Sequence, residues 1–378
     1  MKDLTRLAAV GAIFWALTAA RADAAPRWAE SDVEALLTTV AASAEEGLDP
    51  KDYDAAGLAQ ARDAQAADLD ALADKIALKL AHDFYEGAAP AAVRTDWHIA
   101  REKFDYGAWL DQVLARHSVR ASFARLLPTS PAYLQLKASL ARCPASPATC
   151  QTIAANLDRW RWLPRDLGQR YLWVNVPAYR LDLIEDGRIV ASRKVIVGKP
   201  GTRTPAFQAV VKAITVNPWW NVPCSIVDES IGKLVRQRPQ EAARRGFVSS
   251  VDAKGQLVVR QRPGPDNALG RIKLEMPNPY GVYIHDTPAR SLFAKDARAF
   301  SHGCIRTEEP EELARTLLGP SRAIEVDTLL ITGTTRTLPL ATALPVYVVY
   351  FTAGTSEDGK IETYRDIYGR DARWASYR

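Results

Sequence analysis

Cys304 and His285 are the two residues whose types and order best suit catalysis. Cys304 closes a turn-like segment, Ser-His-Gly-Cys, and His285 ends a β-rich segment that precedes it in the chain. A thiol with its usual pKa of about 8.5 is only partly ionised at neutral pH, so it needs a base. A nearby imidazole takes the thiol proton and later returns it to a leaving amine. The pair predicts acyl transfer through a thioester, with Cys304 as nucleophile and His285 as base.

The residues next to the cysteine suit the same chemistry. Gly303 lets the backbone turn sharply and approach a substrate closely. The amides of Gly303 and Cys304 are then expected to stabilise a tetrahedral oxyanion, and Ser301 and His302 to support the loop or the oxyanion site. A papain-like protease is excluded, because in those enzymes the cysteine precedes the histidine. A zinc site built from His285, His302 and Cys304 lacks a fourth ligand and a familiar spacing, so no metal is predicted.

The first residues predict export. Lys2 and Arg6 precede an apolar stretch over residues 7–20, and Ala22-Asp23-Ala24 then has the small-x-small pattern of a cleavage site. This stretch is too short to span a bilayer comfortably, and no later one reaches the ~20 apolar residues that a membrane helix needs. Residues 1–24 are therefore predicted to be a signal peptide and the mature protein to be periplasmic. The alternative is a buried N-terminal helix.

Composition sets wide limits. The chain is 47% hydrophobic and 25% charged, so it can bury a core, and its length suggests two domains. The formal net charge of +5 is mild and dispersed along the chain. It suits an anionic polymer such as peptidoglycan, or an anionic membrane surface, and gives no argument for nucleic acid.

Export also changes the interpretation of the four cysteines. Cys143 and Cys150 bracket a short loop, and in an oxidising compartment this spacing favours a local disulfide. Cys304 has a catalytic explanation. Cys224 is left as a packing residue or as one that lies near the groove.

The chain divides into a helical part and a β-rich part. Residues 28 to about 142 are alanine-rich, with apolar residues at helical spacing over 31–40, 69–80 and 109–114, and a capping box at 31–34. The rest of the chain is β-rich, with partial alternation of apolar and polar residues. Asp186-Gly187 is expected to form a hairpin turn, and two helices are expected at 225–236 and 308–318. The fold class is α+β. Strands are expected at 171–176, 180–184, 189–197, 210–216, 257–261, 280–284, 323–331 and 346–352.

The motif formed by His285 and residues 301–306, Ser-His-Gly-Cys-Ile-Arg, resembles the signature of the L,D-transpeptidases, the family with the YkuD (ErfK) catalytic domain. Five further stretches resemble its YcbB-like branch in particular. They are Arg-Trp-Arg-Trp-Leu-Pro at 159–164, Val-Gly-Lys-Pro at 197–200 with Thr-Pro at 204–205, Asn-Pro-Trp-Trp-Asn-Val-Pro at 217–223, Arg-Pro-Gly-Pro-Asp-Asn-Ala-Leu-Gly at 262–270 and Ile-Tyr-Gly-Arg-Asp at 367–371. The resemblance runs from about residue 157 to the C-terminus and extends more weakly into the helical part.

The resemblance implies a reaction. Cys304 attacks the carbonyl of meso-diaminopimelate in a donor tetrapeptide stem, expels D-alanine and passes the thioester to an amine of an acceptor stem, in cell-wall biogenesis and maintenance of cell shape. Tyr283, Trp220 and Arg306 shape the substrate site, carbapenems acylate the cysteine, and no cofactor is needed. Residues 26–156 are the helical scaffold domain and 157–378 the catalytic domain, with a capping subdomain at about 224–274.

Two departures from the family pattern stand out. Asp286 occupies a position where the wider family usually has glycine. In place of a peptidoglycan-binding insert there are only about fifteen residues, which include Cys143 and Cys150. Glycan targeting must then come from elsewhere, for example from a partner. The linkage stays open between a 3-3 cross-link of two diaminopimelates and a 1-3 link to an L-alanine amino group.

Other functions remain open from sequence. The same thioester given to water makes an L,D-carboxypeptidase or an endopeptidase. A non-catalytic peptidoglycan-binding scaffold is a different class, for which the loss of Cys304 would have no effect. Attachment of an outer-membrane protein to diaminopimelate is a third possibility within the family.

Overall fold

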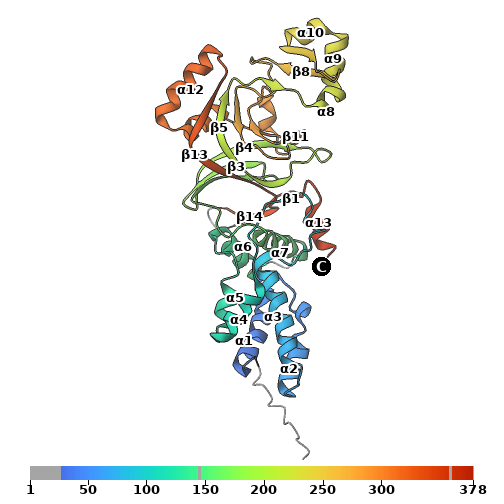
Figure 1. Ribbon diagram of the computed structural model, residues 1–378, viewed down its shortest axis with the longest axis vertical. Coiled ribbons are helices and arrows are strands. Elements are labelled where there is room, and N and C mark those ends of the chain that lie inside the picture. Colours follow the sequence, from blue (N-terminus) through green and yellow to red (C-terminus); the bar gives the residue numbers. More distant parts are fainter. Residues whose placement is uncertain (1–26, 144–145, 357–359, 378) are drawn as a thin grey trace, which may run out of the picture.

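The computed structural model describes residues 27–143, 146–356 and 360–377. The predicted signal peptide lies outside these residues. Figure 1 shows an elongated molecule with helices at one end, a β-rich body in the middle and a small lobe at the far end. Among the described residues, none of the helices is long and apolar enough to cross a membrane.

The helical end begins with α1 (Glu30–Ala42), whose apolar residues Val33, Leu36 and Val40 face a buried core. The predicted capping box at 31–34 does not form, because α1 starts at Glu30 with Ala29 as its N-cap. The remaining helices are α2 (Ala55–Asp63), α3 (Leu69–Glu86), α4 (Tyr106–Ala115), α5 (Val119–Ala124), α6 (Pro131–Ala141) and α7 (Pro147–Arg161).

The helical part also gives one strand to the β-rich body, which the sequence did not predict. β1 (Trp97–His98) pairs in parallel with β5 (Ala206–Val216). The ring of Trp97 packs against Trp162 at a centroid distance of 5.2 Å. These contacts join the two parts of the molecule.

The body is one large sheet in which β5 pairs with both β13 and β9, so that the sheet closes on itself. Apolar side chains of alternate residues point inward and form one core cluster. The strands in this ring are β2 (Arg170–Asn175), β3 (Arg180–Glu185), β4 (Arg188–Gly198), β5, β9 (Ile272–Glu275), β10 (Ile284–His285), β12 (Ile305–Thr307) and β13 (Arg336–Val349).

The predicted hairpin turn is present. Asp186 and Gly187 have positive φ angles of 49° and 75° and connect β3 to β4, as the Asp-Gly pair requires. The body also contains β11 (Ala299–Ser301), a 3-10 helix over Arg290–Ala294, β14 (Ala353–Thr355), β15 (Ile361–Thr363) and α13 (Arg370–Ala375).

Two predicted strands were wrong. Residues 323–331 lie in α12 (Pro320–Thr332), which packs with α11 (Pro310–Leu318) and turns Val326 and Leu329 to the core. The β-branched residues favoured a strand, but Pro320 at the first turn and the three-residue spacing of the buried pair fit a helix. Residues 280–284 contribute only Ile284 to a strand, since Asn278 folds the preceding residues into a turn.

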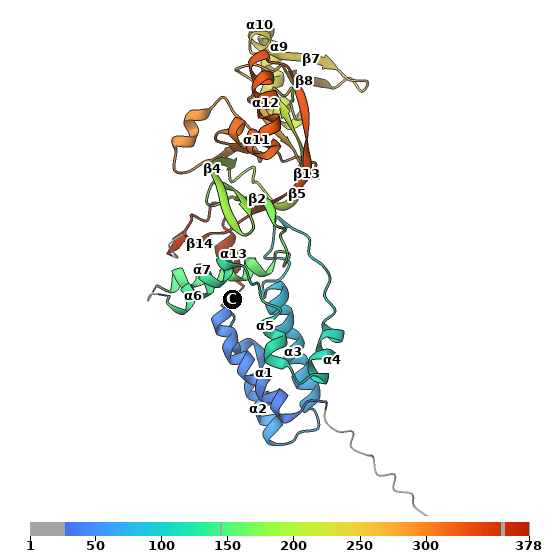
Figure 2. The same cartoon turned by 90° about the vertical axis from the view of Figure 1, so that its left-hand side faces the viewer.

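The small lobe has its own core. A three-stranded sheet in the order β6 (Trp220–Asn221), β8 (Leu257–Gln261) and β7 (Phe247–Val251) packs against α8 (Cys224–Ile226), a π-turn over Val227–Ile231, α9 (Gly232–Gln237) and α10 (Pro239–Arg244). Figure 2 shows the β7–β8 hairpin projecting from it. The apolar core of the lobe runs from Trp220 to Leu269. Residues 272–274, which were assigned to the cap, belong to β9 of the large sheet.

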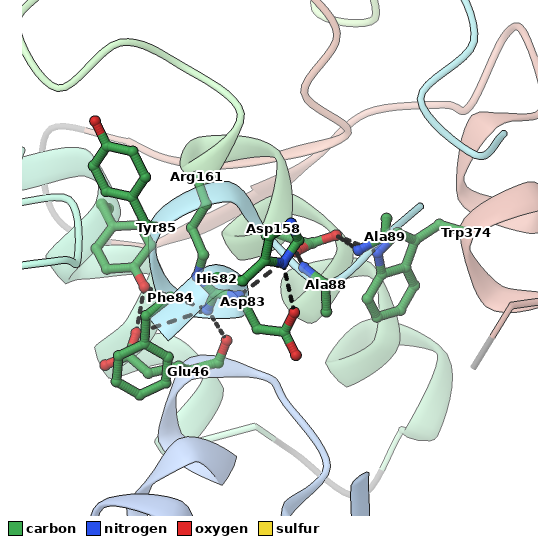
Figure 3. A network of polar contacts seen from close by, with 12 residues as sticks. Glu46, His82, Asp83, Phe84, Tyr85, Ala88, Ala89, Asp158, Arg161 and Trp374 are labelled. Atoms are coloured by element: carbon green, nitrogen blue, oxygen red, sulfur yellow. Dashed lines mark hydrogen bonds and ion pairs between the residues drawn. The ribbon is translucent and has the colours of Figure 1, made fainter. Parts of the chain in front are cut away.

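Helix α7 connects scaffold and body, and the predicted boundary between residues 156 and 157 falls inside it. Asp158 accepts hydrogen bonds from the backbone of Ala88 and Ala89 and, at 2.9 Å, from the indole of Trp374 in α13 (Figure 3). One turn further, Arg161 is fully buried and donates to the carbonyl of Glu46. The helix therefore carries buried polar contacts to both parts.

Candidate active site

The register of three short strands places the predicted catalytic residues on one face of the sheet. In that register His285 of β10 is opposite Arg306 of β12 on one side and Lys273 of β9 on the other. Ile284 and Ile305 alternate with them and fill the core. Cys304 is two residues before Arg306, and the N–H of Ile305 donates to the carbonyl of Tyr283 at 3.0 Å. Since side chains alternate along a strand, Cys304, Tyr283, His285 and Arg306 share the outer face.

Ser301 holds the turn that presents Cys304. Its hydroxyl donates to the Cys304 carbonyl at 2.6 Å and accepts from the Gly303 N–H at 3.1 Å. Gly303 has a φ of 116°, which side-chain-bearing residues rarely adopt. The predicted loop support by Ser301 thus has a geometric basis. The Gly303 amide, in contrast, is engaged inside the turn instead of pointing at a substrate.

The turn is also held from outside, by residues to which no structural role was assigned from the sequence. The buried Thr204 donates its hydroxyl to the Gly303 carbonyl at 2.7 Å and accepts from the Gly198 N–H at 2.9 Å. Tyr368, from the C-terminal segment, donates its hydroxyl to the Gly198 carbonyl and accepts from the Thr204 N–H. Thr204 and Tyr368 lie in the stretches at 204–205 and 367–371 that carry the family resemblance, but neither stretch predicted these contacts.

We expect Thr204→Val to loosen the nucleophile turn. The substitution keeps the shape but leaves the Gly198 N–H and the Gly303 carbonyl unpaired, which costs about 1–3 kcal/mol. Denaturant unfolding should show this loss, and the rate of Cys304 alkylation by iodoacetamide should change with it. The exposed Thr328→Val, whose hydroxyl bonds only within α12, is the control. Equal effects from both variants would contradict the brace.

His285 is neutral at physiological pH. Burial, aided by the positive charge of Arg306, lowers its pKa to about 3. Its side chain is 4% exposed, and its Nδ1 atom has no hydrogen-bond partner within the described parts of the chain. An uncharged imidazole with a free nitrogen can accept a proton, which is what a general base needs.

Cys304 is a thiol in the same conditions. Burial raises its pKa, although the N–H and hydroxyl of Tyr283 and the charge of Arg306 oppose this. The sulfur lies 3.8 Å from the Gly281 carbonyl oxygen. Because both groups are uncharged, the resting pair is a neutral thiol and a neutral imidazole, and the proton must move during attack.

Three further predicted residues surround this pair. Tyr283 is half-buried, with its ring 5.3 Å from that of His285, and burial raises its pKa. Burial lowers the pKa of Arg306, and its Nε has no partner among the residues that the structure describes. Trp220 is 8% exposed and packs in the core of the lobe, where Tyr283 borders it. Trp220 therefore contacts Tyr283 from the core of the lobe.

His302 and Asp286 tie the site to the lobe. His302 Nε2 lies 3.0 Å from a carboxylate oxygen of Glu229 in the lobe. Asp286 accepts from the Arg271 N–H at 2.8 Å, and a Cβ at Gly270 would come within 2.2 Å of its carboxylate. Asp286, at a position where the wider family usually has glycine, therefore holds the backbone at Gly270 and Arg271, where the chain leaves the lobe and enters β9.

The other cysteines lie outside this constellation. A disulfide joins Cys143 to Cys150, and Cys224 is an exposed free thiol on the lobe. No group of three or more acidic, histidine or cysteine side chains suited to a metal occurs in the described ranges.

Residues 169–348 match the family model of the L,D-transpeptidase catalytic domain, YkuD, and residues 20–140 match that of the Scaffold domain. The chain contains an L,D-transpeptidase catalytic domain. This confirms the predicted organisation, an N-terminal helical scaffold followed by a β-rich YkuD domain. The predicted boundary residues and site residues stay predictions.

One curated protein and several solved structures are similar to this chain over part of its length. A Haemophilus influenzae protein, provisionally named an L,D-transpeptidase, is 34% identical over 240 residues, covering 58% of this chain and 48% of that protein. The chain thus spans about half the length of this curated relative. Two solved structures are more distant, an L,D-transpeptidase from Mycobacterium smegmatis (15% identity, TM-score 0.25, 48% of this chain and 58% of that one) and L,D-transpeptidase 3 from Mycobacterium tuberculosis with a faropenem-derived adduct (12%, 0.25, 48% and 60%).

Proposed function

We propose that the protein is a peptidoglycan L,D-transpeptidase with Cys304 as its nucleophile. The observation that carries the proposal is the shared outer face of β10 and β12, which brings a neutral thiol, a neutral buried imidazole and an arginine without a carboxylate partner in the described chain to one place. The matching family model of residues 169–348 names the same reaction class. The substrates, donor and acceptor stems of the wall, place the enzyme in the periplasm.

In this mechanism His285 takes the thiol proton as the Cys304 sulfur attacks the diaminopimelate carbonyl of the donor. The oxyanion is stabilised by the Cys304 N–H, since that of Gly303 is engaged with Ser301. His285 then gives its proton to the leaving amine of D-alanine, and a thioester remains. An acceptor amine attacks the thioester, the carbon–sulfur bond breaks, and His285 passes the amine proton to the departing sulfur, which restores the thiol. Arg306 is placed to bind the terminal D-alanine carboxylate.

The test is mass spectrometry of the products made from purified disaccharide-tetrapeptide. Wild-type protein and Cys224→Ala should form a cross-linked dimer and release D-alanine, whereas Cys304→Ala should do neither. Fragmentation of the dimer assigns a 3-3 or a 1-3 link. Shortened monomer alone would mean a carboxypeptidase. No D-alanine release from any sample would contradict the enzyme and favour the peptidoglycan-binding scaffold.

A further inference from the structure

Lys273 and Glu275 form a fixed charged pair beside the proposed catalytic residues. Lys273 lies opposite His285 in the register, and its neighbours Ile272 and Leu274 fill the core, so both charged side chains point to the outer face. The Lys273 ammonium donates to Glu275 at 2.8 Å and lies 5.1 Å from the centre of the Tyr283 ring. The two side chains are 24% and 31% exposed. The pair is thus accessible from the site.

Hydrogen bonds from neighbouring residues also hold the Lys273–Glu275 pair in place. The second carboxylate oxygen of Glu275 accepts from the Thr215 hydroxyl at 2.6 Å. Thr215 in turn lies 2.9 Å from the hydroxyl of Thr337 on the next strand. A partly exposed ion pair contributes little to stability, so the fold gains little from it. Preorganised charges of this kind are valuable for binding, because less ordering is needed when a ligand arrives.

We propose that Lys273 and Glu275 are the subsite for the zwitterionic end of the donor's diaminopimelate side chain. This inference rests on the proposed function. The Lys273 ammonium binds the free carboxylate of that side chain, and the Glu275 carboxylate binds its free ammonium. Together the four groups place each positive charge beside a negative one.

The dimensions of the sheet agree with this assignment. Neighbouring strands lie about 4.8 Å apart, so β9 and β12 are separated by about twice that distance, with β10 between them. The reactive carbonyl of diaminopimelate is five carbon–carbon bonds from the distal α-carbon, which spans about 6 Å with bonds of about 1.5 Å. The side chains of Lys273 and Glu275 cover the remaining gap. A carbonyl held at Cys304 therefore directs the zwitterion towards the pair.

The proposal is tested by binding in the inactive Cys304→Ala protein, by calorimetry with three disaccharide-tetrapeptides. The third residue is meso-diaminopimelate, side-chain-amidated diaminopimelate or L-lysine. Adding Lys273→Met should weaken binding of the first about tenfold and leave the other two unchanged, since they lack the carboxylate. Adding Glu275→Gln should weaken all three by a similar factor, because all carry the ammonium. Lys254→Met, in an exposed turn of the lobe, is the matched control.

The subsite would be overturned if Lys273→Met weakened the binding of all three peptides equally, or weakened the binding of none. Failure of the proposed function has a different signature, which is the absence of D-alanine release by wild-type protein from the diaminopimelate peptide. Binding in the Cys304→Ala background does not depend on that release. The two failures are therefore distinguishable.

Discussion

His285→Gln is expected to slow acylation of Cys304 by a carbapenem by on the order of 10²–10⁴-fold, the usual contribution of a positioned base. Glutamine keeps polarity and approximate size but cannot take up the thiol proton. Stopped-flow fluorescence or intact-protein mass spectrometry over time measures the rate. His82→Gln, an exposed histidine of the scaffold, controls for the loss of an imidazole elsewhere.

The pH profile separates a base from a residue that only supports the fold. Burial keeps the pKa of His285 at about 3 and raises the pKa of Cys304, so neither group changes charge between pH 5 and 7. The wild-type rate should be nearly flat there. Without the base, only the thiolate reacts, and the rate in His285→Gln should rise about tenfold per pH unit. A flat profile in the variant, or an unchanged rate, would contradict general-base catalysis.

The candidate catalytic pair could be proposed from the sequence because its signal is local. Cys304 and the residues around it form a short turn, and the hairpin turn at Asp186-Gly187 is likewise determined by adjacent residues. The pairing of β10 with β12 depends on contacts between residues far apart in the chain, so the sequence suggested His285 and Cys304 without showing their common face. The strand prediction for α12 failed because β-branched residues favour strands, whereas the packing of Val326 and Leu329 in the core selects a helix here.

The supporting residues were not predictable for the same reason. Thr204 and Tyr368 are ordinary side chains by type, and they become important only because the fold brings positions separated by 99 and 164 residues together. The engagement of the Gly303 amide by Ser301 is similar, since it depends on the exact turn geometry. Long-range hydrogen bonds of this kind leave no periodic pattern in a sequence.

Arg161→Met is expected to lower the free energy of unfolding by about 3–5 kcal/mol, the range for breaking a buried ion pair. Arg161 is fully buried, 3.6 Å from a carboxylate oxygen of Asp158 and 3.9 Å from one of Glu46, which are also buried (Figure 3). Removing the guanidinium leaves both carboxylates without this cation in a medium of low polarity. Urea unfolding followed by tryptophan fluorescence measures the loss.

The control is Arg170→Met, which breaks a 2.7 Å pair with Glu185 whose side chains are 42% and 39% exposed. That pair should contribute less than about 1 kcal/mol. Glu46 keeps its ion pair with Lys137 in the variant, so the loss of stability comes mainly from the buried carboxylate of Asp158. Equal losses for Arg161→Met and Arg170→Met would show that burial of the network has no energetic consequence.

Arg161→Met also tests whether the scaffold affects only the stability of the fold or also the reactivity of Cys304. Arg161 lies in α7, whose contacts reach the helical part through Glu46 and Ala88 and the C-terminal helix through Asp158 and Trp374. Arg161 itself bonds to Glu46, Tyr133 and Asp158, and not to Thr204 or Tyr368, which brace the Cys304 turn. Below its unfolding transition, Arg161→Met should therefore acylate at the wild-type rate while unfolding at lower urea. A slower rate in the folded variant would mean that α7 also positions the nucleophile.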